Sequence, residues 1–180
     1  MEGLVFLDFD GVICDSLLET LVSSWRGYYI LLGEEQPPVM PVSLLRQFKR
    51  LRPYVRAGED FILIHELIAR KVPVQSQHDF DDRLAERGEE KINRYRESFY
   101  AARTNILVKD REYWIGLNKL YPHVVPCLKA WGSSSSLYIL STKRAQFIVE
   151  ILSAKGMLLD PNRVLSCEAK EKKDTILRTL

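Results

Sequence analysis

The sequence predicts an α/β protein, a core with a doubly wound parallel sheet that is interrupted by a long helical insertion. Three observations predict this class. Residues 3–9 (GLVFLDF) form a short apolar run that ends at Asp10-Gly11, as a buried strand that ends in a tight turn does. Residues 137–140 (LYIL) form a second such run and are followed by Ser-Thr-Lys. Most of the chain between these runs carries apolar residues at helical spacing.

The first strand is apolar at successive positions, which predicts burial on both faces of a sheet and not an edge position. A helix is expected to start at Asp15 and to end at Gly33. Further helices are expected at residues 43–51, 59–71, 83–103 and 110–120, the first of them capped by Ser43. The polar segment 76–82 is expected to form a loop.

The α/β pattern returns after Tyr121-Pro122. Helices are expected at residues 124–131 and 145–155, a very short strand at 164–165 and the start of an amphipathic helix at 171–180. The sequence therefore predicts a core formed by residues 1–15 and 121–180, and a helical insertion formed by residues 16–120.

Length and composition exclude several classes of protein. The chain has 180 residues with 46% hydrophobic and 28% charged residues, as expected for one globular domain or for one core with an insertion. A formal charge of +2 gives no basic excess for nucleic-acid binding. No apolar run approaches the roughly 18 residues of a membrane helix. The absence of a signal-peptide pattern, together with three widely spaced cysteines, predicts a cytoplasmic protein with reduced thiols.

The strongest chemical signal is LDFDGVICDS, at residues 7–16. Asp8 and Asp10 lie two residues apart at the carboxyl end of the first strand, where ligands bind in open α/β sheets. Two carboxylates so close repel each other unless a cation lies between them, and a divalent metal ion with oxygen ligands suits that position. One carboxylate is then a candidate nucleophile, and the other a candidate general acid and base.

These residues resemble the first motif of the haloacid dehalogenase superfamily of hydrolases, an apolar strand followed by DxD and a turn. The resemblance continues in chain order. LYILSTK is similar to the second motif, in which a strand ends in Ser or Thr, here Ser141. CEAKEKKDTIL resembles the third, a lysine at the start of a helix, for which Lys173 is preferred to Lys172 and Lys170. The helical insertion lies where this superfamily inserts a cap, so the resemblance implies a Rossmann-like core with a helical cap.

The resemblance also implies roles for these residues. Asp8 attacks a phosphoryl group to form an aspartyl-phosphate, and Asp10 protonates the leaving oxygen and then activates water. Mg²⁺ lies between the Asp8 carboxylate and the Asp10 backbone carbonyl. Ser141 hydrogen-bonds a phosphoryl oxygen, and Lys173 stabilises the charged intermediate. Taken alone, Ser141 is more typical of a turn or helix cap, and Lys173 of a solvated surface charge.

The chain departs from the superfamily pattern at its end. The fourth motif, an acidic pair that supplies further Mg²⁺ ligands, should follow the lysine helix, and the sequence ends at Leu180. Three interpretations follow: a fragment of a longer phosphatase, which is preferred; a natural form that has lost activity; or a missing strand supplied by another chain. Little or no hydrolysis is therefore expected from the 180-residue chain itself.

The sequence thus predicts a Mg²⁺-dependent phosphomonoester phosphatase of the haloacid dehalogenase type that acts on a small phosphorylated metabolite. Its catalytic residues are Asp8, Asp10, Ser141 and Lys173, and its metal ligands are Asp8 and Asp10. The alternative is a catalytically inactive binding or regulatory protein with the same fold. The sequence identifies neither the substrate nor the oligomeric state.

Overall fold

The computed structural model describes residues 4–34, 36–131 and 136–167. The chain divides into two compact units, which are described separately below. The first unit combines Met1–Ser16 with Ile115–Leu180, and the second is Leu17–Trp114. The boundaries predicted from the sequence lie after residues 15 and 120.

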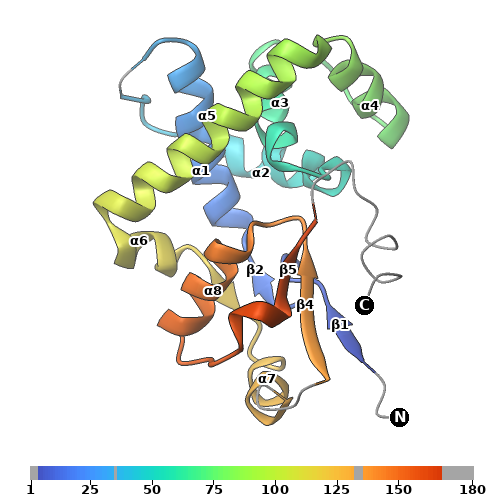
Figure 1. Ribbon diagram of the computed structural model, residues 1–180. Coiled ribbons are helices and arrows are strands. Elements are labelled where there is room, and N and C mark those ends of the chain that lie inside the picture. The colour runs from blue at the N-terminus through green and yellow to red at the C-terminus, as the bar shows by residue number, and fades with distance from the viewer. Residues whose placement is uncertain (1–3, 35, 132–135, 168–180) are drawn as a thin grey trace. The chain divides into compact units, whose positions relative to one another are not determined.

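The first unit is built on a parallel sheet, which confirms the predicted α/β class (Figure 1). Its described strands are β1 (Val5–Leu7), β4 (Leu137–Ser141) and β5 (Val164–Ser166), in the order β1-β4-β5. Leu7 is the register partner of Ile139, which in turn pairs with Val164. The carboxyl ends of all three strands therefore lie at the same edge of the sheet.

Helices connect the strands of this unit. The segment before β4 forms α7 (Val125–Trp131), and β4 leads through α8 (Ala145–Ala154) to a short 3₁₀ turn, η2 (Pro161–Arg163), and β5. α8 buries an apolar face made of Phe147, Ile148, Ile151 and Leu152. These elements lie where the sequence predicted them, because each apolar face has the period of its element.

The first strand differs from its prediction in burial. Leu4 and Val5 are 50% and 41% exposed. Within the described part of the sheet, β1 pairs only with β4 and so occupies an edge position. An apolar composition predicts that a strand tends to be buried, but the exposed fraction of its side chains depends on which elements pack beside it.

A short antiparallel ladder joins two distant segments of the first unit. β2 (Cys14–Asp15) pairs with β3 (Lys119–Leu120). The helix expected at 110–120 is consequently shorter, since α6 covers only Arg111–Gly116 and the chain then extends to form β3. The backbone N–H of Tyr121 also donates to the carbonyl of Ile13, at 3.0 Å. This pairing ties the segment before α7 to the loop that follows β1.

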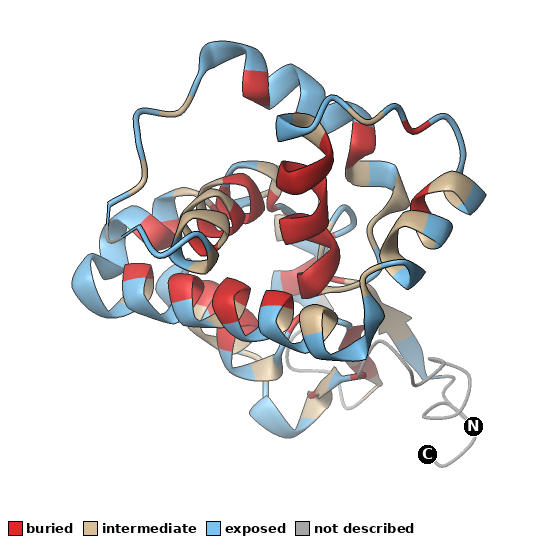
Figure 2. Cartoon of the chain, turned by 90° about the horizontal axis from the view of Figure 1, so that it is seen from above, coloured by how far each residue is buried: buried red, intermediate tan, exposed pale blue. Residues whose placement is uncertain are grey.

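The second unit is helical throughout its regular elements. They are α1 (Leu17–Leu31), α2 (Val42–Leu51), the 3₁₀ turn η1 (Arg52–Tyr54), α3 (Gly58–Ala69), α4 (Gln77–Ala85), α5 (Gly88–Lys109) and the start of α6. α3 is buried at every position from Gly58 to Leu67, and Figure 2 shows a helix that is red over most of its length among helices that are red on one side. Among the described residues of the whole chain, no helix is long and apolar enough to span a bilayer.

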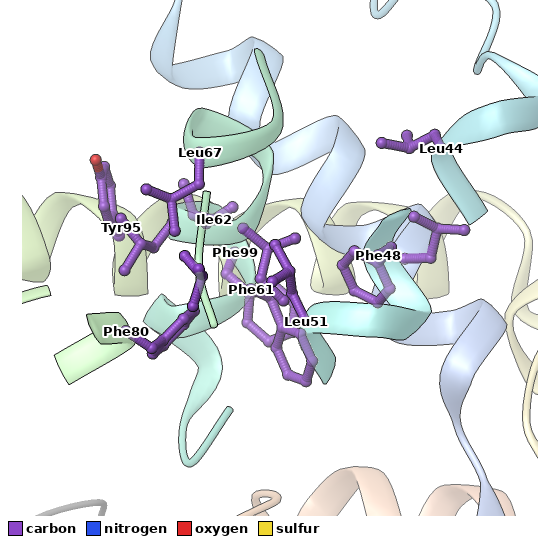
Figure 3. Close-up of a cluster of buried hydrophobic side chains, with 13 residues drawn as sticks. Leu44, Phe48, Leu51, Phe61, Ile62, Leu67, Phe80, Tyr95 and Phe99 are labelled. Carbon is purple, nitrogen blue, oxygen red and sulfur yellow. The ribbon is translucent and has the colours of Figure 1, made fainter. Parts of the chain in front are cut away.

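Aromatic and aliphatic side chains from five helices form the core of this unit (Figure 3). Phe48 stacks on Phe61 with ring centroids 5.9 Å apart, and Phe61 stacks on Phe99 at 5.3 Å. Such pairs contribute about 0.5–1.5 kcal/mol beyond the burial of their area. The insertion therefore has a hydrophobic core of its own.

Two local predictions in this unit are wrong. The expected loop at 76–82 is mostly the helix α4, which begins after Ser76. The Ser76 Oγ accepts from the backbone N–H of Asp79, and the Asp79 carboxylate accepts from the N–H of Ser76, both at 3.1 Å. This reciprocal pair is a capping box, which starts a helix even where the following residues are polar. Ser43 is no cap, because α2 begins after Pro41 and makes no side-chain cap hydrogen bond.

Candidate active site

The loop after β1 holds the two predicted carboxylates in a tight turn. The Phe9 carbonyl accepts hydrogen bonds from the backbone N–H groups of Ile13 and Cys14, both at 2.9 Å. The N–H of Gly11 donates to the Cys14 carbonyl at 2.9 Å. Gly11 has a φ of +82°, a conformation that a side chain disfavours, so the glycine permits the turn. The backbone, and not a flexible loop, therefore sets the positions of Asp8 and Asp10.

The two carboxylates have different hydrogen-bond partners. Asp8 Oδ1 accepts from the backbone N–H of Phe9 at 2.7 Å. Asp10 Oδ1 accepts from the ammonium group of Lys143 at 3.1 Å, and the Asp10 side chain is 21% exposed. Asp8 is thus oriented by the backbone of its own segment, whereas Asp10 is held by a cation from the turn that follows the neighbouring strand β4.

Ser141 ends β4, the strand beside β1. It lies two residues after Ile139, the register partner of Leu7, so Ser141 and the Asp8–Asp10 segment share one edge of the sheet. Ser141 is 1% exposed, and its Oγ accepts from the backbone N–H of Lys143 at 3.3 Å. The hydroxyl thus caps the turn after β4, which is the role typical of a serine that follows a strand.

Lys143 is the site residue that the sequence analysis missed. Its side chain is 1% exposed, and its Nζ lies 5.6 Å from the centroid of the Phe9 ring as well as beside Asp10. Ser166, at the end of β5, fixes the backbone around it: the Ser166 Oγ accepts from the N–H of Ala145 at 2.6 Å and donates to the Lys143 carbonyl at 3.4 Å. The signal for this residue was present, since a lysine closes the Ser-Thr-Lys turn after the second predicted strand.

The predicted motif lysine lies outside the described residues. Lys173, and its alternatives Lys170 and Lys172, fall within 168–180. In the described part of the site, the cation beside the predicted carboxylates is therefore Lys143.

The described residues meet the minimum requirement for Mg²⁺. Asp8 and Asp10 offer hard carboxylate and carbonyl oxygens, and Mg²⁺ in proteins is often held by one or two carboxylates, with water and substrate phosphate completing its shell. No group of three or more His, Cys, Asp or Glu side chains with metal-binding geometry occurs among the described residues. Any Mg²⁺ held by these two residues alone would thus rely on water and substrate for its other ligands.

Comparison with known proteins gives matches among solved structures alone, since no family model and no curated protein matches this chain. One similar structure is a haloacid dehalogenase superfamily hydrolase of subfamily IA from Geobacter sulfurreducens, with 14% identity and a TM-score of 0.49 over 99% of this chain and 70% of that one. Another is a haloacid dehalogenase-like hydrolase from Streptococcus pneumoniae, with 19% identity and a TM-score of 0.48 over 99% and 68%.

Both structures are hydrolases of the superfamily that the sequence motifs of this chain resemble. At 14% and 19% identity the likeness concerns the course of the backbone. The chemistry of this chain therefore has to be argued from its own residues.

Proposed function

We propose that this chain is a hydrolase of the haloacid dehalogenase type that cleaves small phosphomonoesters through an aspartyl-phosphate at Asp8. One observation carries the proposal: Asp8 and Asp10 lie at the hydrogen-bonded end of β1, and the ammonium group of the buried Lys143 lies 3.1 Å from Asp10. Phosphoryl transfer depends mainly on positioning and on charge stabilisation, and this arrangement offers both.

The reaction takes two steps. In the first, Asp8 attacks phosphorus, the bond between phosphorus and the ester oxygen breaks, and Asp10 gives its proton to the departing alcohol. In the second, Asp10 takes a proton from water, the resulting nucleophile attacks phosphorus, and the bond between Asp8 and phosphorus breaks. Inorganic phosphate leaves and both aspartates return to their starting states.

The hydrogen bonds suggest which oxygen atoms react. The Phe9 N–H donates to Asp8 Oδ1 and so orients the carboxylate to which we assign the attack on phosphorus. Asp10 Oδ1 accepts from Lys143 and cannot carry a proton toward that ammonium group, so the transferred proton belongs on Asp10 Oδ2. Lys143 thereby orients the acid, and its charge offsets negative charge on the phosphoryl oxygens.

Mg²⁺ would be held by the Asp8 carboxylate and the Asp10 backbone carbonyl, and when bound it neutralises charge on the phosphoryl group. Ser141 lies at the edge of the sheet where its hydroxyl could donate to a phosphoryl oxygen, and its Oγ could at the same time keep the hydrogen bond that it accepts from the Lys143 N–H. The substrate we propose is correspondingly a small phosphorylated metabolite.

The test is hydrolysis of p-nitrophenyl phosphate with and without Mg²⁺, by the chain and by two matched variants. Any turnover that the chain shows should require Mg²⁺, and Asp8→Asn, which removes the nucleophile, should abolish it. Asp82→Asn makes the same chemical change on exposed α4 and should leave turnover unchanged. Hydrolysis that survives in Asp8→Asn would refute the proposal.

A second candidate, a phosphate-binding protein without turnover, is favoured by the same Lys143 contact, because that contact engages one oxygen of the proposed acid. Calorimetry with inorganic phosphate separates the two candidates. Binding that weakens in Lys143→Met without any hydrolysis by the wild-type chain would favour the binding protein over turnover by this chain.

A further inference from the structure

A second pocket lies within the helical unit and shares no residue with the Asp8–Asp10 site. Its volume is about 250 Å³. Its walls come from the carboxyl-terminal parts of α1 and α3 and from the first half of α5, with the loop residues that follow α1 and α3. The lining residues are Tyr28, Leu31, Leu32, Glu66, Arg70, Lys91, Arg94 and Tyr95.

The pocket has a cationic rim above one buried carboxylate. The Glu66 side chain is 7% exposed, and its Oε2 accepts from Lys91 Nζ at 2.9 Å. The guanidinium groups of Arg70 and Arg87 each lie 3.3 Å from Glu66 Oε1. The Arg70 and Lys91 side chains are 64% and 41% exposed, so these cations reach toward solvent while the acid lies beneath them.

Glu66 remains ionised in this setting. Burial alone would raise its pKa, but hydrogen bonds from Tyr95 and Lys91, together with the charges of Arg87 and Lys91, outweigh burial, and the pKa of Glu66 is lowered. The positive charges of the cations beside Glu66 therefore outnumber its single negative charge. The local excess of positive charge is present at neutral pH.

Arg94 adds a cation that this carboxylate does not neutralise. Within the described parts of the chain, Arg94 has no carboxylate partner within 4.0 Å, although Glu90 lies one turn before it on α5. A guanidinium group in a pocket presents a planar fork of donors that fits the oxygens of a carboxylate or phosphate. Arg94 is accordingly the side chain best placed to receive an oxyanion.

The remaining walls are apolar. Leu32 is 55% exposed, which leaves apolar surface at the mouth of the pocket. The ring of Tyr95 belongs to the core cluster, and Figure 3 shows its hydroxyl directed away from Phe80, which leaves the hydroxyl to bond Glu66. A ligand that fills the pocket would therefore meet cations at one side and leucine and tyrosine carbon atoms at the other.

We propose that this pocket binds a small organic oxyanion, a carboxylate or phosphate group carried on an apolar body, with Arg94 and Arg70 holding the anionic group. Leu31 and Leu32 contact the apolar body. The proposal is independent of the phosphatase activity, because none of these residues belongs to the Asp8–Asp10 site.

The test is calorimetric titration of the full chain with three probes at pH 7. 2-Naphthoate carries both features, 2-naphthalenemethanol is its uncharged counterpart, and inorganic phosphate is an anion without the apolar body. We expect 2-naphthoate to bind at least tenfold more tightly than 2-naphthalenemethanol. The tight binding should persist in Asp8→Asn, which separates this pocket from the proposed active site.

Two arginine variants locate the binding. Arg94→Gln should weaken the binding of 2-naphthoate at least fivefold and leave the binding of 2-naphthalenemethanol unchanged. Arg46 is an exposed cation on α2, and Arg46→Gln should change the affinity for neither probe. Equal weakening by both variants would mean non-specific attraction and would overturn the proposal. The proposal would also fail if 2-naphthalenemethanol bound as tightly as 2-naphthoate. It would fail as well if inorganic phosphate, at equal concentration, displaced 2-naphthoate from the Asp8→Asn variant.

Discussion

Each of the two units contains an ion pair with a buried cation, and the two pairs differ in how the carboxylate is surrounded. In the helical unit, Glu19 and Arg103 are 0% and 3% exposed. Arg103 donates two hydrogen bonds to the Glu19 carboxylate, both at 2.8 Å, and Ser23 and Trp114 donate further ones at 2.7 and 3.2 Å. Protein groups thus meet the carboxylate on both oxygens.

In the sheet unit, Lys143 is equally buried, but its partner is not enclosed. The Asp10 side chain is 21% exposed, and the ion pair lies at the carboxyl edge of a parallel sheet. The Glu19 pair joins two helices, α1 and α5, that pack along their lengths, whereas the Asp10 pair joins a strand-end loop to a turn.

The difference teaches what each pair can do. A carboxylate enclosed on every side by protein donors can only hold its helices together, because neither substrate nor water can replace those donors. A carboxylate with one side open to solvent can exchange partners during a reaction. Burial of the cation alone does not distinguish the two cases; exposure of the anion does.

The largest expected effect comes from removing the enclosed cation. Arg103→Met leaves the Glu19 charge buried, which should lower the free energy of unfolding by about 3–5 kcal/mol. Arg56→Met breaks an exposed pair with Asp81 and should cost about 1 kcal/mol or less. Urea denaturation of both variants measures the difference, and equal losses would contradict it. The double variant Glu19→Met/Arg103→Met should regain part of the stability, because no unpaired charge remains.

Removing the cation of the open pair should act on activity more than on stability. In Lys143→Met, water can solvate the partly exposed Asp10, so the free energy of unfolding should fall by only about 1 kcal/mol. Any hydrolysis of p-nitrophenyl phosphate by the chain should fall about 100-fold, as for the loss of one group that stabilises developing charge. Lys155→Met, on an exposed residue of the same unit, is the control. A loss of stability as large as that of Arg103→Met would show that the two pairs are alike.

The smallest expected effect concerns a buried histidine of the helical unit. His65 is 2% exposed, and burial lowers its pKa to about 3, from 6.5. Below pH 6.5 the unfolded chain binds a proton that the folded chain does not, so stability falls as the pH falls, by about 1.4 kcal/mol per pH unit. His65→Phe removes this dependence.

The measurement is the difference in free energy of unfolding between wild type and His65→Phe, at pH 7 and at pH 5. Burial raises the pKa of Asp60 to about 6, so that residue acts in the opposite direction over part of this range, but it is present in both proteins and cancels in the difference. An unchanged difference between the two pH values would show that His65 becomes protonated in the folded protein.

Much of the fold could be predicted because it depends on local pattern. The strands at residues 137–141 and 164–166 and the helices α3 and α8 lie within a few residues of their predicted positions, since apolar periodicity is a property of each segment alone. α4 was not predicted because its nine residues are mostly polar and the feature that starts it is the Ser76–Asp79 capping box. A short helix with mostly polar residues has no apolar periodicity from which it could be predicted.

The candidate site divides in the same way. The sequence was enough to predict Asp8 and Asp10 as candidate site residues, because a DxD pair directly after an apolar strand is a local feature whose position in a sheet follows from the strand. The contact between Lys143 and Asp10 could be found only from the folded structure, because it joins residues 133 positions apart through the pairing of β1 with β4. The excess of positive charge around Glu66 could likewise be found only from the folded structure, since the cations of α3 and α5 come together only when these helices pack.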